Sequence, residues 1–523
     1  MTPVLANSLF VSLLVQAVQS AGRMGHIPLS VPETTPDGAF AVPADFFSFG
    51  AESGFWEAYN NDFSETVVGA VGNRMSLPLP FRVGGTSGDG LVYNPNQHNK
   101  TYCDSGPQCS KGNLDIFHVG PSHFDTYKRF QNVTLILQAP MAVEMDMDNS
   151  VGYISASMKA RGKGPVSAIA LGNEPNWFLY PDNHMDAYVK DALGLEASIT
   201  KNLSLTGDAA RIFQVAEIAW ESMDNPDFNL AGVMERFDHN SQIKFASVHS
   251  YGVHGYKDHH VYNGTNLLQQ ELMNATAIKN NLQSYKINAD FIRSYDSSVP
   301  LVISENANAL GVPPVEWAGG FGAAIWAVAF HLQAMAIGIQ RVCNTQNPSS
   351  THSYWVPEAP NKHFKQPVVQ GVFPAAPFIA DFVGKDDDLG KVVELNVNNN
   401  DYFSAYGLYN LESNKPRRIA LVNLRVFDKS TNPNRGTTKV ELQVGNGVKR
   451  ASLRRMTSGY GVFARGYDQG GKIESVSWAG EEFSYKMNNG WGLVTGQQQE
   501  SLTVDNGVIT VPVRDTEAVI VDL

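Results

Sequence analysis

The sequence predicts an α/β protein, a closed (β/α)8 TIM barrel followed by an antiparallel β-sandwich, on three observations. Between residues 46 and 346, eight short apolar runs alternate with helical or irregular stretches, which is the pattern of a parallel sheet. Eight such units in roughly 300 residues fit a closed barrel better than an open sheet. After about Phe378 the chain changes to short strands separated by turn residues, a pattern typical of a sandwich.

The domain limits and the broad class follow from composition. We predict the barrel over residues 46–377 and the sandwich over residues 378–523. Residues 21–45 are an extended, proline-containing segment, and pairing with the sandwich is one expectation for them. Charged residues make up 17% and hydrophobic residues 43% of the 523 residues, so we expect a large core and no general disorder. The net charge of -12 disfavours DNA or RNA as a partner.

The N-terminus favours export from the cell. Residues 1–20 are predicted to be a signal peptide, because the apolar stretch from Leu5 ends in small residues and is short for a membrane span. An uncleaved anchor is the alternative. After cleavage we expect a secreted protein that is not bound to a membrane. Five N-glycosylation sequons agree with export: Asn99, Asn132, Asn202, Asn263 and Asn274.

The three cysteines fit an exported protein. Cys103 and Cys109 lie six residues apart in a polar loop, so they are candidates for a disulfide that closes a small loop. Cys343 lies in an apolar segment and is expected to be a free, buried thiol. No cysteine and histidine cluster has the spacing of a zinc site.

Two of the predicted barrel strands end in a glutamate. The run that starts at Ala168 reaches Asn173 and Glu174 before Pro175 stops it, and the run from Pro300 reaches Glu305. In barrels of this kind the chemistry lies at the carboxyl ends of the strands. Taken alone, Glu174 suits a structural carboxylate as well as a catalytic one. Two carboxylates held by one rigid sheet, however, are the groups that cleave glycosidic bonds.

Four short stretches connect the chain to a known family. They are Val83–Thr86 (VGGT), Leu171–Pro175 (LGNEP), Val248–Tyr251 (VHSY) and Ile303–Asn306 (ISEN). With these stretches and the barrel-plus-sandwich layout, the chain resembles glycoside hydrolase family 79, the β-glucuronidase and heparanase-like group of retaining barrel glycosidases. The resemblance extends over nearly all of the chain after the signal peptide.

The resemblance implies roles for the residues around the two glutamates. Glu305 would be the nucleophile and Glu174 the general acid and base. Asn173 would bind the 2-hydroxyl of the sugar, and Tyr251 would donate a hydrogen bond to Glu305. A turn asparagine and a core tyrosine are the structural alternatives for these two residues.

Two further residues are expected to bind the sugar. Glu52 would accept hydrogen bonds from ring hydroxyls, although a plain loop carboxylate is equally expected there. Tyr354 matches the place where family members hold the uronic carboxylate with a tyrosine and the backbone. Some members also use a tyrosine soon after the nucleophile, and the segment 306–310 has none. His249 and Trp177 are assigned only packing roles.

The resemblance therefore implies a secreted retaining exo-β-glucuronidase. Its partner would be a glycan with a terminal β-linked glucuronic acid, with or without a 4-O-methyl group. The alternatives are an endo-acting heparanase-like enzyme, another barrel glycosidase such as a xylosidase or arabinofuranosidase, and a catalytically inactive glycan-binding protein. No cofactor is implied, because a proton donor and a carboxylate nucleophile suffice.

Overall fold

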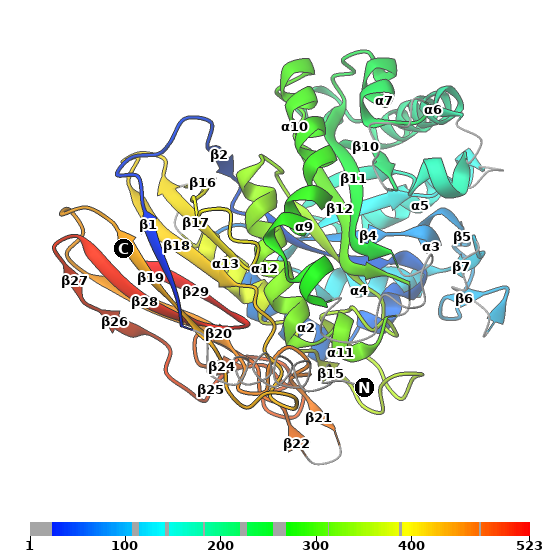
Figure 1. Ribbon diagram of the computed structural model, residues 1–523. Helices are drawn as coiled ribbons and strands as arrows, with labels where there is room; N and C mark the ends of the chain where they lie inside the picture. The colour runs from blue at the N-terminus through cyan, green and yellow to red at the C-terminus, as the bar shows by residue number, and fades with distance from the viewer. Residues whose placement is uncertain are drawn as a thin grey trace, which may run out of the picture.

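The computed structural model describes residues 24–106, 114–141, 146–180, 184–219, 227–254, 268–311, 313–385, 390–469 and 472–523. The predicted signal peptide, Cys109 and Asn263 lie outside these residues. Figure 1 shows two bodies side by side, a barrel surrounded by helices on the right and a β-rich domain on the left. The predicted fold class is confirmed.

The barrel is closed by eight parallel strands in the described part of the chain, and each strand pairs with its sequence neighbour in the barrel. The strands are β3 (Phe47–Glu52), β4 (Leu79–Gly84), β8 (Val133–Ala139), β9 (Val166–Leu171), β10 (Phe213–Ile218), β11 (Ile243–His254), β12 (Leu301–Leu310) and β13 (Val342–Gln346). These are the eight apolar runs of the sequence. Because all strands run the same way, their carboxyl ends meet at one mouth.

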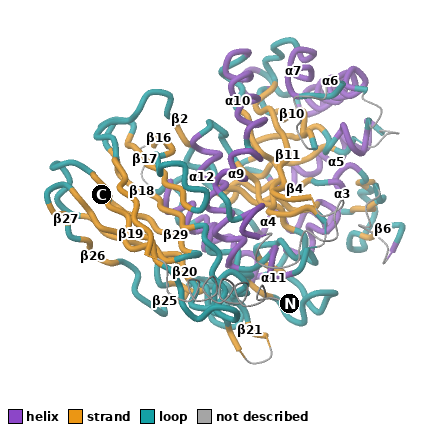
Figure 2. Tube along the Cα trace, viewed as in Figure 1, coloured by secondary structure: helices purple, strands orange, loops and turns teal. Residues whose placement is uncertain are grey.

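Helices cover the outside of the barrel (Figure 2). They are α2 (Asp62–Gly72), α4 (Asp125–Arg129), α5 (Met147–Arg161), α6 (Met185–Leu203), α7 (Leu230–Phe237), α9 (Ala275–Asn281), α10 (Gln283–Tyr295), α12 (Phe321–Ala336) and α13 (Ala375–Val383). Four of them start at an Asn or Asp whose side chain accepts a hydrogen bond from the backbone three residues on, which satisfies a free N–H of the first turn. These caps explain where the helices begin.

Helix α12 is apolar almost all round and is buried along nearly its whole length. Together with the short helix α11 (Val315–Ala318) it forms the one helical stretch in the described residues that is long and apolar enough to cross a membrane. That stretch is buried inside the protein, as expected for a helix that packs on every side.

The β-rich domain consists of two packed sheets, as predicted for a sandwich. One sheet contains β1 (Met24–Ser30), β19 (Thr437–Gln443), β28 (Val508–Arg514) and β27 (Val504–Asp505). The other contains β2 (Phe40–Val42), β16 (Gly390–Glu394), β17 (Phe403–Asn410), β18 (Pro416–Asn423), β29 (Glu517–Asp522), β20 (Ala451–Thr457), β23 (Ser477–Trp478), β24 (Glu481–Glu482), β25 (Leu493–Val494) and β26 (Glu500–Leu502). An apolar core fills the space between them.

The N-terminal segment belongs to this domain in space. Strand β1 pairs with β19 in parallel, and β2 pairs with β16. Helices α12 and α13 lie between the barrel and the larger sheet (Figure 1). The predicted boundary at residue 378 falls within α13, because that helix continues the barrel and the first sandwich strand after it is β16.

The cysteines and the loop between β4 and β8 complete the fold. Cys343 is a free thiol with 1% of its surface exposed, which confirms its predicted state. Cys103 is disulfide-bonded. The loop around Cys103 includes the short strands β6 (Tyr102–Cys103) and β7 (Phe117–Val119), which pair with each other. Strand β7 also pairs with β5 (Leu91–Tyr93).

Candidate active site

The two predicted glutamates meet at the mouth of the barrel. Strand β9 ends at Leu171, and Gly172 turns the chain with a φ of 80°. Glu174 itself has a left-handed φ of 45°, which its bulky side chain rarely adopts. Glu305 lies within β12. A carboxylate oxygen of Glu174 lies within 4.8 Å of one from Glu305, so the two segments, distant in sequence, form one site.

The surroundings of the two carboxylates shift their proton affinities in opposite directions. Burial raises the pKa of Glu174, although a hydrogen bond with His249 opposes the shift. Burial also acts to raise the pKa of Glu305, but the positive charges of His249 and Arg82 hold it below its usual range. At one pH, Glu174 can therefore carry a proton while Glu305 is ionised, which is the arrangement of an acid beside a nucleophile.

Glu305 is held by two donors, one on the neighbouring strand β11 and one on β4, across the barrel. Nη1 of Arg82 donates to its Oε2 at 3.1 Å, and the hydroxyl of Tyr251 donates to its Oε1. The contact predicted for Tyr251 is therefore present. Donors that face a carboxylate stabilise its charged form, so both residues keep Glu305 ionised.

Asn173 is fully buried next to Glu174. Its Oδ1 accepts a hydrogen bond from Nη2 of Arg82 at 2.7 Å, and its backbone N–H donates to Asp89 at 3.1 Å. Its side-chain Nδ2 has no hydrogen-bond partner in the described part of the protein. A buried donor without a partner is costly, so this amide is suited to bind a hydroxyl group of a ligand.

Glu52 lies at the carboxyl end of β3 and is bound to the glycine turn after β4. Its Oε2 accepts a hydrogen bond from the backbone N–H of Ser87 at 3.0 Å. Gly85, with a φ of 85°, approaches so closely that a Cβ there would lie 2.4 Å from the Glu52 carboxyl group. Burial, followed by the charge of Glu305, raises the pKa of Glu52 to about 7. The VGGT stretch thus positions a carboxyl group at the mouth.

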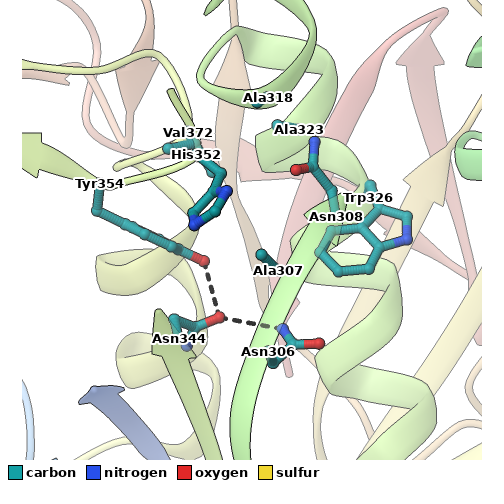
Figure 3. Close-up of a pocket in the computed structure, with 10 residues that line it drawn as sticks. All are labelled: Asn306, Ala307, Asn308, Ala318, Ala323, Trp326, Asn344, His352, Tyr354 and Val372. Atoms are coloured by element: carbon teal, nitrogen blue, oxygen red, sulfur yellow. Dashed lines mark hydrogen bonds between the residues drawn. The ribbon is translucent and has the colours of Figure 1, made fainter. Parts of the chain in front are cut away.

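Tyr354 lies in the wall of a small cavity beside β12, the strand that carries Glu305 (Figure 3). The cavity has a volume of ≈ 10 Å³, enough for about one water molecule. The hydroxyl of Tyr354 donates to Oδ1 of Asn344 at 3.1 Å, so it offers a ligand an acceptor instead of the expected donor. Within the described residues, Asn306, Asn308 and His352 each have one buried polar side-chain atom without a hydrogen-bond partner.

The structure adds three residues that the sequence did not assign to the site: Arg82, Glu217 and His249. His249, expected only to pack, contacts Glu174 through Nδ1 at 2.9 Å and Glu217 through Nε2 at 3.0 Å. Arg82 and Glu217 each interrupt an apolar strand with a charge, and both are almost fully buried. A charge inside a buried strand is costly unless it is paired, and this was the signal available in the sequence. Trp177, by contrast, is 44% exposed.

A closed barrel with an acid and a carboxylate facing each other at its mouth defines a glycoside hydrolase. Comparison with known proteins agrees. The family model "Glycosyl hydrolase family 79 C-terminal beta domain" matches residues 405–520. A β-glucuronidase of Neurospora crassa is 25% identical over 438 residues, which cover 77% of this chain and 75% of that protein. A β-glucuronidase of Aspergillus niger is 24% identical over 572 aligned positions, with 98% of both chains covered.

Solved structures show the same fold. A 4-O-α-L-rhamnosyl-β-D-glucuronidase from Fusarium oxysporum superposes with a TM-score of 0.77 at 18% identity, over 95% of this chain and 100% of that one. A family 51 arabinofuranosidase from Xanthomonas axonopodis reaches 0.60 at 11% identity, over 95% and 99% of the two chains. These matches agree with the resemblance to glycoside hydrolase family 79 that the sequence stretches predicted.

Proposed function

We propose that the protein is a retaining exo-β-glucuronidase, which removes terminal β-linked glucuronic acid from glycans. The observation that carries the proposal is the pair of oppositely shifted carboxylates, Glu174 and Glu305, with oxygens within 4.8 Å of one another. Retaining enzymes have carboxyl groups about 5–5.5 Å apart, and inverting enzymes about 6.5–9.5 Å. The names of the two curated relatives support glucuronic acid as the sugar.

The reaction has two steps. Glu305 attacks the anomeric carbon and the bond to the leaving oxygen breaks, while Glu174 gives that oxygen its proton. Glu174, now a carboxylate, takes a proton from water, and the water oxygen attacks the same carbon and releases Glu305. The anomeric configuration is therefore kept. Arg82 and Tyr251 hold Glu305 in its ionised form, and the free amide of Asn173 is suited to bind the 2-hydroxyl group.

A panel of p-nitrophenyl glycosides tests the proposal. We expect hydrolysis of the β-glucuronide and much slower hydrolysis of the β-xyloside and the α-L-arabinofuranoside. We expect NMR to show the β anomer as the first product. The Glu305→Gln variant should lose activity by at least about 10⁴-fold, as expected for loss of a covalent nucleophile. Equal rates for Glu305→Gln and the wild type would exclude the nucleophile, and an α anomer would exclude retention.

The exo mode and secretion are parts of the same proposal. Digestion of a glucuronylated oligosaccharide, with and without a 4-O-methyl group, should release the single sugar and not shorter chains. To test secretion, the protein is recovered from the culture medium of cells that express it. Its first residue should lie near residue 21. It should lose mass on enzymatic deglycosylation, because Asn99, Asn132 and Asn202 are exposed. Retention of residues 1–20 would instead indicate an anchor.

A further inference from the structure

We propose that Glu217 is a positioning residue that acts through His249, keeping this imidazole doubly protonated so that Glu174 can release and regain its proton. The proposal rests on the proposed function of Glu174 as the acid and base. It concerns a carboxylate that the reaction itself does not need, since neither step involves Glu217 directly.

The backbone around Glu217 is strained. Ala216 and Glu217 have φ values of 80° and 48°, both are fully buried, and the pairing of β10 with β11 shifts register between Val215 and Ile218. Left-handed conformations of non-glycine residues cost of the order of 1–3 kcal/mol each and persist only where the surroundings impose them. The result is a direct link to the acid, because the carbonyl oxygen of Glu217 accepts the N–H of Glu174 at 3.0 Å.

The side chain of Glu217 is surrounded by donors. Its Oε2 accepts from Arg82 at 3.1 Å and from Ser304 at 2.6 Å, and its Oε1 accepts from Gln214. Burial acts to raise its pKa, but the charge of Arg82 and the bond with His249 lower it to about 2. Glu217 is therefore a permanent buried anion beside the ring of His249.

His249 is placed between this anion and the acid. Nδ1 lies 2.9 Å from Glu174 and Nε2 lies 3.0 Å from Glu217, while Oε2 of Glu305 is 3.9 Å from Nδ1. A neutral imidazole carries one N–H and cannot donate to carboxylates at both nitrogens, whereas an imidazolium can. Burial acts to lower the pKa of His249, but Glu305 and the bonds with Glu174 and Glu217 raise it to about 9.

This arrangement stabilises the charge that forms on Glu174 during the reaction. When Glu174 gives its proton to the leaving oxygen, it becomes an anion in a buried site, which burial opposes. The N–H at Nδ1 of His249 stabilises that anion, and the charge of Glu217 keeps the second proton on Nε2. Arg82 also faces Glu217 and Glu305, so the groups around His249 are three carboxylates and one cation.

The Glu217→Gln variant tests the proposal. Without the buried anion, His249 should lose its second proton at a lower pH, and the pKa of Glu174 should rise because its cationic neighbour is lost. The basic limb of the kcat/KM profile for an aryl β-glucuronide should then move to higher pH. At the wild-type optimum, kcat for a poor leaving group should fall about 10- to 100-fold, the size expected for loss of a charged hydrogen bond, with KM little changed.

A second measurement does not depend on turnover. In protein labelled with ¹⁵N-histidine, the signal absent from His249→Gln identifies this ring. In the wild type, the ¹⁵N signals of the His249 ring should show both N–H groups up to about pH 9. In Glu217→Gln, one of these N–H groups should be lost at a lower pH. If the wild type hydrolyses no β-glucuronide, the proposed function fails, and this measurement still tests the pairing.

Two further variants keep the test decisive. Glu217→Asp keeps the charge but draws the carboxylate away from Nε2 of His249, so it should give the same shifts in smaller size and serves as the test where Glu217→Gln does not fold. Glu196→Gln is the matched control, because Glu196 is a buried carboxylate on α6 that pairs with Asn240 away from the site, and its pH profile should equal that of the wild type. An unchanged basic limb and an unchanged ¹⁵N titration in Glu217→Gln would overturn the proposal.

Discussion

At the scale of single residues, the surroundings of Glu174 and Glu305 shift the pKa values of these two carboxyl groups in opposite directions. The proposed mechanism requires Glu174 to be protonated and Glu305 to be ionised, so kcat/KM should follow a bell-shaped pH profile. It should fall as acid protonates Glu305, whose pKa is lowered, and fall again as base ionises Glu174, whose pKa is raised. Because the two groups interact, the limbs report apparent values of the pair.

The pH profile of one variant separates the two limbs. In Glu174→Ala the basic limb should disappear for 2,4-dinitrophenyl β-glucuronide, since this leaving group needs no proton, while the acidic limb remains. Added azide should restore turnover and give the β-glucuronyl azide, because the small anion reaches the space left by the side chain. A basic limb that persists in Glu174→Ala would assign it to another group.

Tyr251 offers a second prediction at this scale. Tyr251→Phe removes the hydroxyl that donates to Glu305 and keeps the ring. A hydrogen bond to a charged group contributes about 1.5–3 kcal/mol, so kcat/KM should fall about 10- to 100-fold, and the acidic limb should move to higher pH because the carboxylate loses a donor. Tyr153→Phe, on α5 and away from the mouth, is the control. An acidic limb that does not move in Tyr251→Phe would show that its hydroxyl does not stabilise the Glu305 anion.

At the scale of elements, the sequence predicted the repeated barrel strands but did not predict which side chains from different strands meet at the site. Each apolar run became a barrel strand because burial on both faces leaves a continuous apolar signal. Glu174 and Glu305 were predictable because each ends or interrupts such a run in a recognisable stretch. Arg82, Glu217 and His249 come from three different strands, and their roles depend on which side chains face each other across the barrel. A single sequence does not show that.

Strand β1 is the element whose contribution can be measured most directly. Leu29 is fully buried in the core between the two sheets and pairs with Leu442 of β19. Leu29→Ala should reduce the free energy of unfolding by about 2–5 kcal/mol, the usual cost of such a cavity, with kcat and KM unchanged. Urea unfolding gives the value.

The same strand supplies the control. His26 forms a pair with Glu441 at 3.1 Å but is 54% exposed, and exposed pairs contribute about 1 kcal/mol or less. His26→Ala should therefore have a free energy of unfolding close to that of the wild type. If Leu29→Ala and His26→Ala have equal effects, β1 contributes its backbone pairing only.

At the scale of the whole molecule, the barrel and the sandwich share one core. The apolar cluster that fills the barrel continues through α12 and α13 to residues of the larger sheet such as Tyr406 and Trp478. Tyr406 also donates to Gln333 of α12 at 2.9 Å, in a fully buried bond. Domains joined by a large apolar interface are not expected to move or unfold separately. The sandwich therefore holds helix α12, which packs against β12.

Calorimetry tests this continuity through Asp381, on α13. Its Oδ2 accepts from Arg74, which follows α2, and from Trp478 of β23, each at 2.7 Å. It also lies 3.4 Å from Arg454 of β20. Asp381→Ala removes the acceptor of these mostly buried donors, which should reduce the free energy of unfolding by about 2–4 kcal/mol. For a single unit of this size that lowers Tm by about 2–4 °C. Asp290→Ala, in an exposed pair with Lys286, should leave Tm unchanged. We expect one transition in the wild type and in both variants, and two separate transitions in the wild type would contradict a shared core.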